Sequence, residues 1–356
     1  MTGDAAVLVE QRGRLGLLTL NRPKAINALT HTMVELIAEA MDAWEYDDAI
    51  ATVAVVGAGD RGLCAGGDVV SLYRDVTDGD GSGAAAFWRD EYALNARIAR
   101  YPKPFVAIQD GIVLGGGIGV SAHGSHRVVT ERSKLGFPEV TIGYIPDVGA
   151  TWLLAQAPGE LGVRLALTAG NVGPADAILV GFSDHFISSD RIPALLLALE
   201  TEEPAAAIAR LASEPEPGVI AAQRDWTDAA FGASSVTGIL DRLRNSGDEA
   251  ASALADVIAR KSPLALAVTL EALRRARHLS SLEVALAQEY RVSRHSSMTP
   301  DFAEGIRAQL VDKDRSPIWQ PAAHADVNAA DVAAFFEAPP EGDLDLTTAS
   351  ASKETT

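Results

Sequence analysis

The chain has 356 residues, 30 of them basic and 48 acidic, and this length can bury the core of one large domain with an appendage or of two ordinary domains. Its net charge of −18 disfavours nucleic acid and anionic membranes as partners, because both select basic surfaces, and no run approaches the about 20 apolar residues of a membrane helix. The single cysteine, Cys64, excludes an intrachain disulfide and a cysteine-based zinc site, and the seven histidines have no recognisable metal-ligand spacing, so we expect no metal.

The first residues, MTGDAAVLVEQRGRLG, carry acidic side chains early and have no basic segment followed by an apolar one. Such a start is not typical of a signal peptide or a transit peptide. The sequence therefore predicts a cytoplasmic protein.

Short β-branched runs alternate with helical patterns up to about residue 190, and this alternation predicts an α/β fold. The runs are LGLLTL at 15–20, TVAVVG at 52–57, FVAI at 105–108, RVVT at 127–130 and DHFI at 184–187. Between the first two runs, Thr30 is a good N-cap for an amphipathic helix that ends near Asp47.

From about residue 200 onward, alanine, leucine, glutamate and arginine dominate, and a helical region is predicted. A linker is predicted at SEPEPG, 213–218. We accordingly divide the chain into a core at 1–200, a helical region at 201–339 and a polar tail at 340–356, for which disorder is predicted.

Two glycine clusters, GLCAGGD at 62–68 and DGIVLGGGIG at 110–119, each follow a strand-like run and precede a helical pattern. Free N–H groups in such a turn suit a developing oxyanion or a phosphate, although a tight packing turn is the more frequent explanation of each cluster alone. Neither cluster fits the spacing of a dinucleotide-binding motif.

Three acidic residues are candidates for chemistry. Glu91 shares a helical stripe with Phe87, Leu94 and Ile98, and a carboxylate on an apolar stripe needs a partner. Its alternative is an edge position paired with an arginine.

Glu139 and Asp147 lie eight residues apart in a connection punctuated by glycine and proline. The alternative for Glu139 is a surface turn, and the alternative for Asp147 is a helix N-cap.

A serine and a cysteine are further candidate nucleophiles. Ser121 and His123 are two residues apart, so on a helix they point to different faces, and the segment lacks GxSxG; both are interpreted as packing or capping residues. Cys64 has no histidine near it in sequence and is interpreted as a small buried side chain.

Taken in order, four motifs resemble the crotonase (enoyl-CoA hydratase/isomerase) superfamily: NRPKAINAL at 21–29, GLCAGGD at 62–68, YPKPFVAIQDGIVLGGGIG at 101–119 and PEVTIGYIPDVGAT at 138–151. Two segments resemble its 3-hydroxyisobutyryl-CoA hydrolase branch: FWRDEYALNARI at 87–98 and DFAEGIRAQLVDKDRSPIWQP at 301–321. The resemblance implies a ββα superhelical core with a helical C-terminal region.

The resemblance also implies a site. The N–H of Ala65, or of its neighbour Gly66, and the N–H of Gly116 would form an oxyanion hole. Of the two glutamates of a hydratase, Glu139 is present, whereas Gly119 occupies the other position. One carboxylate does not provide the paired acid and base roles of hydration.

The acids of the hydrolase branch match Glu91 and Asp147, which implies cleavage of an acyl-CoA thioester with Glu139 as nucleophile or general base. The implied substrate is a short 3-hydroxyacyl-CoA, 3-hydroxyisobutyryl-CoA of valine catabolism before others, with no cofactor beyond the CoA it carries. An enoyl-CoA isomerase or hydratase is the alternative, and a homo-oligomer is possible. Arg22 and Lys24 are candidates for the CoA phosphates.

Overall fold

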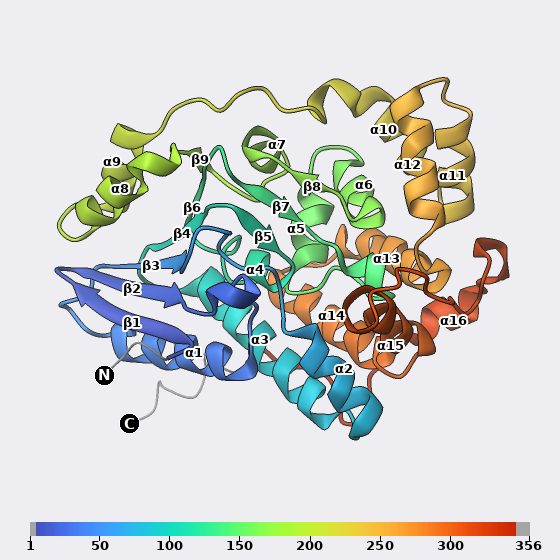
Figure 1. Ribbon diagram of the computed structural model, residues 1–356, viewed down its shortest axis with the longest axis horizontal. Coiled ribbons are helices and arrows are strands. Elements are labelled where there is room, and N and C mark those ends of the chain that lie inside the picture. The colour runs from blue at the N-terminus through green and yellow to red at the C-terminus, as the bar shows by residue number, and fades with distance from the viewer. Residues whose placement is uncertain (1–4, 347–356) are drawn as a thin grey trace. The chain divides into compact units, whose positions relative to one another are not determined.

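The computed structural model describes residues 5–346 (Figure 1). These residues form two compact units that are interleaved along the chain. Among the described residues, the first unit comprises 5–68, Arg97–Gly136 and Asn171–Ala222, and the second comprises Val69–Ala96, Phe137–Gly170 and 223–346. The functional boundaries predicted at residues 200 and 339 stay predictions. Among the described residues, no helix is long and apolar enough to cross a membrane.

The first unit is built on a six-stranded sheet with the order β1-β2-β3-β4-β6-β9. β1 and β2 are antiparallel and the remaining neighbours are parallel, which confirms the α/β prediction. All five predicted strands are present. The strands are β1 (Val7–Arg12), β2 (Leu15–Leu20), β3 (Thr52–Gly57), β4 (Phe105–Gln109), β6 (His126–Val129) and β9 (His185–Phe186).

A second, three-stranded sheet of this unit has the order β5-β7-β8 and consists of β5 (Ile112–Leu114), β7 (Lys134–Gly136) and β8 (Asn171–Val172). The predicted first helix is confirmed as α1 (His31–Glu45), with the Thr30 hydroxyl accepting from the N–H of Met33, and α1 contacts β1 and β2. The other helices are η1 (Pro23–Ala25), α4 (Gly116–Gly119), α7 (Pro174–Leu179), η3 (Ser189–Arg191), α8 (Ile192–Leu199) and α9 (Pro204–Leu211).

The second unit is made of helices, which confirms the helical C-terminal region. From the first two of its segments come α2 (Val69–Asp78), α3 (Ser82–Arg100, whose last turn belongs to the first unit), η2 (Glu139–Ile142), α5 (Ala150–Gln156) and α6 (Leu161–Thr168). After η4 (Ala221–Gln223), the rest are α10 (Arg224–Phe231), α11 (Val236–Arg244), α12 (Glu249–Ala259), α13 (Pro263–Ala276), α14 (Leu282–Ser296), α15 (Pro300–Ile306), the π-helical η5 (Arg307–Val311), η6 (His324–Asp326) and α16 (Ala329–Ala334).

The predicted disordered tail is wrong for residues 340–346. Arg291 pairs with Asp343 (2.6 Å) and Arg294 pairs with Glu341, while Leu344 and Leu346 are buried. The acidic residues of this segment thus complement arginines of α14, a match that apolar periodicity does not reveal. Residues 347–356 lie outside the described part of the chain.

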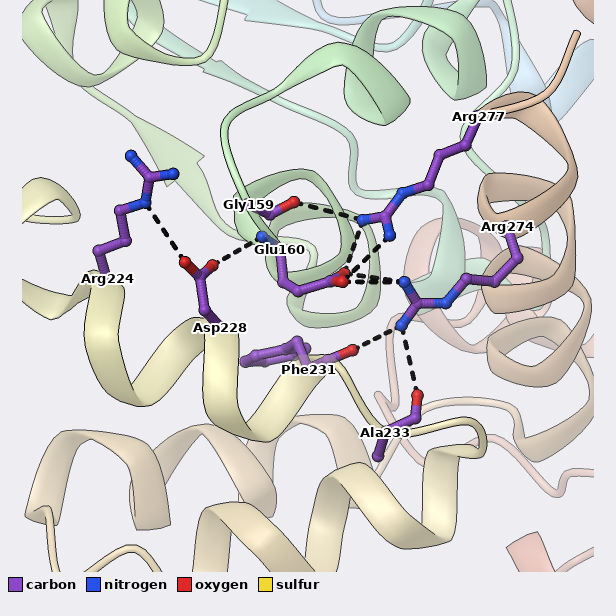
Figure 2. Close-up of polar contacts among 8 residues, drawn as sticks. All are labelled: Gly159, Glu160, Arg224, Asp228, Phe231, Ala233, Arg274 and Arg277. Atoms are coloured by element: carbon purple, nitrogen blue, oxygen red, sulfur yellow. Dashed lines mark hydrogen bonds and ion pairs between the residues drawn. The ribbon is translucent and has the colours of Figure 1, made fainter.

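Charged side chains join helices within the second unit (Figure 2). Glu160, which precedes α6, accepts hydrogen bonds from Arg274 (3.0 Å) and Arg277 (2.7 Å) at the end of α13. Asp228 of α10 accepts from the backbone N–H of Glu160 (2.7 Å), and places a negative charge at the start of α6. Both acids therefore stabilise the packing around α6.

Candidate active site

Five carboxyl side chains are buried among the described residues of the second unit. One of them, Asp301 on α15, accepts hydrogen bonds from the Ser262 hydroxyl (2.5 Å) and the N–H of Gln320 (2.7 Å). The other four, whose charges interact, are Glu91 on α3, Glu139 at the start of η2, Asp147 between η2 and α5, and Glu289 on α14, with exposed fractions of 2, 8, 6 and 0 %. Three of them were predicted as candidates, and their burial rules out the surface turn for Glu139 and the exposed edge for Glu91. Buried carboxyl groups without arginine or lysine partners are costly, so their concentration in one unit marks a functional site.

Asp147 is held by phenol groups. Tyr92 Oη donates to Asp147 Oδ2 at 2.6 Å and Tyr144 Oη donates to the same oxygen at 3.0 Å. Ser293 Oγ lies within hydrogen-bond distance of both phenol oxygens, at 2.7 Å from that of Tyr92. The N-cap of α5 is Gly149, with no side-chain cap, so the capping alternative for Asp147 is wrong.

Burial raises the pKa of Asp147 to about 6, although the hydrogen bonds from Tyr92 and Tyr144 act in the opposite direction. These phenol groups stabilise the ionised form, because each donates its proton to the carboxylate. Asp147 therefore changes its charge close to neutral pH.

The pKa of Glu139 is raised well above its usual range, first by burial and then by the negative charge of Asp147. Glu91 also contributes to this shift, and the pKa of Glu91 is itself raised by burial and by Asp147. One oxygen of each glutamate, Glu139 Oε2 and Glu91 Oε1, has no hydrogen-bond partner among the described residues. These two oxygens can bind a ligand or exchange a proton.

Glu289 was missed by sequence reasoning. Its carboxyl oxygens accept hydrogen bonds from the N–H groups of Gly149 (2.6 Å) and Thr151 (2.8 Å) and from the Thr151 hydroxyl (2.6 Å). Burial raises the pKa of Glu289 to about 8 against these bonds. Its contacts hold the turn that carries Asp147 and leave it no free oxygen, which is a positioning role. The signal was the same as for Glu91, because Leu286, Glu289 and Val292 follow helical spacing.

The two glycine clusters lie side by side in the first unit. Leu114 N–H donates to the carbonyl of Cys64 (2.9 Å), and a Cβ on Gly66 would lie 3.9 Å from the backbone nitrogen of Gly116. Gly66 has a φ of +107°, which favours glycine, and α4 begins at Gly116 as predicted. The two loops therefore bring backbone N–H groups into one neighbourhood.

Their hydrogen bonds change the predicted oxyanion donor. The N–H of Ala65 donates to the carbonyl of Ile26 (2.9 Å), so Ala65 has no donor to offer a substrate. The N–H of Gly66 is directed at Cys64 Sγ (3.4 Å). Within the described residues, the N–H groups of Gly67 and Gly116 have no acceptor, so Gly67 replaces the predicted neighbours as the candidate beside Gly116.

The two rejected nucleophiles are unsuited to attack. Ser121 Oγ donates to the carbonyl of Gly117 (2.7 Å) and accepts from Gln109 Nε2 (3.0 Å), and it is fully buried. Cys64 is also fully buried.

The two residues predicted to bind the CoA phosphates, Arg22 and Lys24, differ in their contacts within the protein. Arg22 is bonded to Asp68 (3.1 Å) and to the carbonyl of Ala28 (2.5 Å), which occupies its guanidinium. Lys24 is exposed. Of the two, Lys24 is free to meet a phosphate.

The sequence profile described as "Enoyl-CoA hydratase/isomerase" matches residues 15–336. The chain belongs to the enoyl-CoA hydratase/isomerase family. Curated relatives include the mitochondrial 3-hydroxyisobutyryl-CoA hydrolases of Xenopus tropicalis, 37% identical over 96% of this chain and 91% of that protein, and of Homo sapiens, 36% identical over the same shares.

Solved structures of this family confirm the crotonase fold. A carnitinyl-CoA dehydratase from Mycobacterium thermoresistibile is 52% identical, covers 97% of this chain and 99% of its own, and has a TM-score of 0.93. An enoyl-CoA hydratase from Rhodobacter sphaeroides is 39% identical, covers 96% of this chain and 100% of its own, and has a TM-score of 0.91.

Gly119 occupies the position at which the resemblance implies the second glutamate of a hydratase. Gly119 is buried in the short helix α4 and has no side chain with which to carry a proton. The acids of the site instead come from Glu91 and Asp147, the two positions that the hydrolase motifs predict.

Proposed function

We propose that the chain hydrolyses 3-hydroxyisobutyryl-CoA to 3-hydroxyisobutyrate and CoA. The observation that carries the proposal is the cluster of Glu91, Glu139 and Asp147 in a chain with glycine at position 119. The names of the curated relatives, 35–37% identical over nearly the whole chain, support the same activity.

In this proposal Glu139 performs the chemistry by one of two routes. As a nucleophile, its carboxylate attacks the thioester carbon, the C–S bond breaks, CoA leaves as a thiolate that takes up a proton, and water then hydrolyses the mixed anhydride. As a general base, it takes a proton from the water that attacks the same carbon. Both routes need ionised Glu139, whose raised pKa makes it a stronger base than an exposed glutamate.

In this proposal, the N–H groups of Gly67 and Gly116 donate hydrogen bonds that stabilise the negative charge developing on the thioester oxygen. Removal of one such donor costs about 10²–10³ in kcat in other enzymes. Asp147, held by Tyr92 and Tyr144, acts on the charge of Glu139 rather than on the substrate. No metal or further cofactor enters the proposal.

The alternative is an enoyl-CoA hydratase or isomerase, which the names of the two solved structures favour. Product analysis after incubation with 3-hydroxyisobutyryl-CoA separates the two. Hydrolysis gives free CoA and 3-hydroxyisobutyrate, whereas dehydration keeps the thioester and gives an enoyl-CoA, which would contradict the proposal.

The cellular compartment of this chain and the metabolic pathway in which it acts are also matters of proposal. The curated relatives are named as mitochondrial proteins, whereas the sequence of this chain predicts the cytoplasm. If the substrate is 3-hydroxyisobutyryl-CoA, as proposed, the reaction belongs to valine catabolism. A homo-oligomer stays a prediction.

A further inference from the structure

A buried polar atom without a hydrogen bond indicates a place where a ligand or a water molecule can bind. Among the described residues, such side-chain atoms belong to five residues: Glu91, Asn95, Glu139, Thr269 and His324. Two of these are acids of the candidate site. Asn95 is the one whose amide oxygen and amide nitrogen are both without a partner while its exposed fraction is 0 %.

Asn95 lies on the same face of α3 as Glu91. The two residues are four positions apart within Ser82–Arg100, and side chains at this spacing are neighbours, with about 5–6 Å between their Cβ atoms. Glu91 in turn is close enough to Asp147 and Glu139 for their charges to interact. The free amide of Asn95 therefore borders the carboxyl cluster inside the second unit.

The amide differs from the neighbouring acids in that its hydrogen-bonding capacity does not change with pH. An ionised carboxylate only accepts hydrogen bonds, whereas the carboxamide of asparagine donates and accepts at once and does not titrate. An alcohol needs both kinds of partner, because its O–H donates and its oxygen accepts. Glu91 Oε1 and the Asn95 amide, one helical turn apart and both without partners, offer that combination.

We propose that Asn95 is a specificity-determining residue that binds the 3-hydroxyl of the acyl group, its amide N–H donating to the hydroxyl oxygen while Glu91 accepts the hydroxyl proton. The inference rests on the proposed function and names a recognition residue for it. A site built to bind a hydroxyl rejects the analogue that lacks it, because its own polar groups then stay unpaired. Asn95 thus explains how a 3-hydroxyacyl group is chosen over a plain acyl group of the same shape.

The experiment compares kcat/KM for 3-hydroxyisobutyryl-CoA and isobutyryl-CoA in the wild type and in Asn95→Leu. We expect the variant to lose about 100-fold on the hydroxylated substrate, within the range of one to two lost hydrogen bonds to a buried group. We expect the rate on isobutyryl-CoA to change less than 3-fold, about the spread of an apolar replacement of similar volume. A preference ratio equal to that of the wild type would overturn the inference.

Thr269→Val is the matched control, because Thr269 is also fully buried with an unpartnered hydroxyl but lies on α13, which supplies none of the buried acids. Its preference ratio should equal that of the wild type. Asn95→Leu should unfold no earlier than the wild type, since no protein hydrogen bond is lost. If Asn95→Leu unfolded at a lower temperature and kept the wild-type preference ratio, Asn95 would have a structural role and no role in recognition. If the leucine variant does not fold, Asn95→Thr is compared in the same way.

A binding measurement separates failure of this inference from failure of the proposed function. In the Glu139→Gln background, calorimetry with the two CoA esters reports recognition without turnover. We expect the hydroxylated ester to bind more tightly than isobutyryl-CoA, and the added Asn95→Leu change to abolish the difference. Equal binding of both esters before that change would overturn the inference whatever reaction the wild type performs. A wild type that binds selectively but releases no CoA would contradict the proposed function alone.

Discussion

At the scale of single residues, the site depends on keeping several acids close together without compensating cations. Burial raises the pKa values of Glu91, Glu139 and Asp147, and the charge of Asp147 raises those of the two glutamates further, so these groups do not all ionise together at neutral pH. The phenol groups of Tyr92 and Tyr144 stabilise the charge on Asp147. Asp147 therefore ionises before Glu139, and its charge keeps Glu139 basic.

The first prediction concerns Glu139→Gln. The change removes the reacting carboxylate but preserves its shape, so kcat should fall by at least about 10²-fold while binding of the CoA ester stays within a few-fold. Steady-state kinetics and a binding titration measure the two quantities. Retention of more than about a tenth of the wild-type kcat would remove Glu139 from the chemistry.

The second prediction concerns Asp147→Asn and pH. An aspartate whose pKa rises from 3.8 to about 6 on folding binds protons more tightly in the folded state. Its contribution to stability is present below about pH 4 and is lost as the pH rises through about 6. Raising the pH from 4 to 8 should therefore stabilise the variant relative to the wild type, by about 1–3 kcal/mol. Denaturant unfolding at the two pH values measures this, and a difference independent of pH would contradict it.

The sequence predicted Glu91, Glu139 and Asp147 as candidates, because the resemblance points to all three and the helical stripe points to Glu91 as well. It did not identify Tyr92 and Tyr144 as partners of Asp147, nor Ser293 as the hydroxyl that contacts both phenols, and Tyr92 and Ser293 lie 201 positions apart in the chain. It also offered Ala65 as an oxyanion donor, because only the hydrogen bonds of the folded loop show that the N–H of Ala65 already donates to the carbonyl of Ile26.

At the scale of elements, α3 supplies Glu91, Tyr92 and Asn95 from adjacent faces, while α14 supplies Glu289 and Ser293. The predicted strands β2, β3 and β4 are nearly continuous apolar runs, so they were recognisable. β5, β7 and β8 have two or three residues each and carry no periodicity to detect. β1 is exposed to solvent over most of its length, so its sequence also lacks an apolar pattern that would predict a strand.

The third prediction concerns the contacts of Glu160 in Figure 2. Its side chain is 14% exposed and bonds to both Arg274 and Arg277, so Glu160→Gln should lower the free energy of unfolding by about 1–2 kcal/mol. Glu271→Gln, which breaks the exposed pair with Arg275, is the control and should cost less than about 0.5 kcal/mol. Chemical denaturation measures both, and equal effects of the two changes would contradict the prediction.

At the scale of the whole molecule, each unit is assembled from three separate stretches of chain. The acids come from all three stretches of the second unit, and the glycine loops come from two stretches of the first. Local sequence patterns predict helices and strands but not which distant stretches share a unit. Only the family resemblance, which orders the motifs, made the residues of the site predictable.

The fourth prediction is that turnover survives both EDTA and thiol alkylation. The proposed chemistry uses carboxyl groups and backbone N–H groups, and Cys64 is fully buried and away from reagents. Rates measured before and after each treatment should agree within error. Loss of activity with EDTA that a divalent cation restores would reveal a metal requirement.

The central claim is that this chain cleaves thioesters and does not add water to double bonds. Two assays run in parallel test it: a thiol-reactive dye reports free CoA from 3-hydroxyisobutyryl-CoA, and ultraviolet absorbance reports loss of the double bond of an enoyl-CoA. Glycine at position 119 supplies neither acid nor base for hydration, so we expect rapid thiol release and no appreciable loss of enoyl absorbance. Rapid loss of enoyl absorbance without free thiol would contradict the claim.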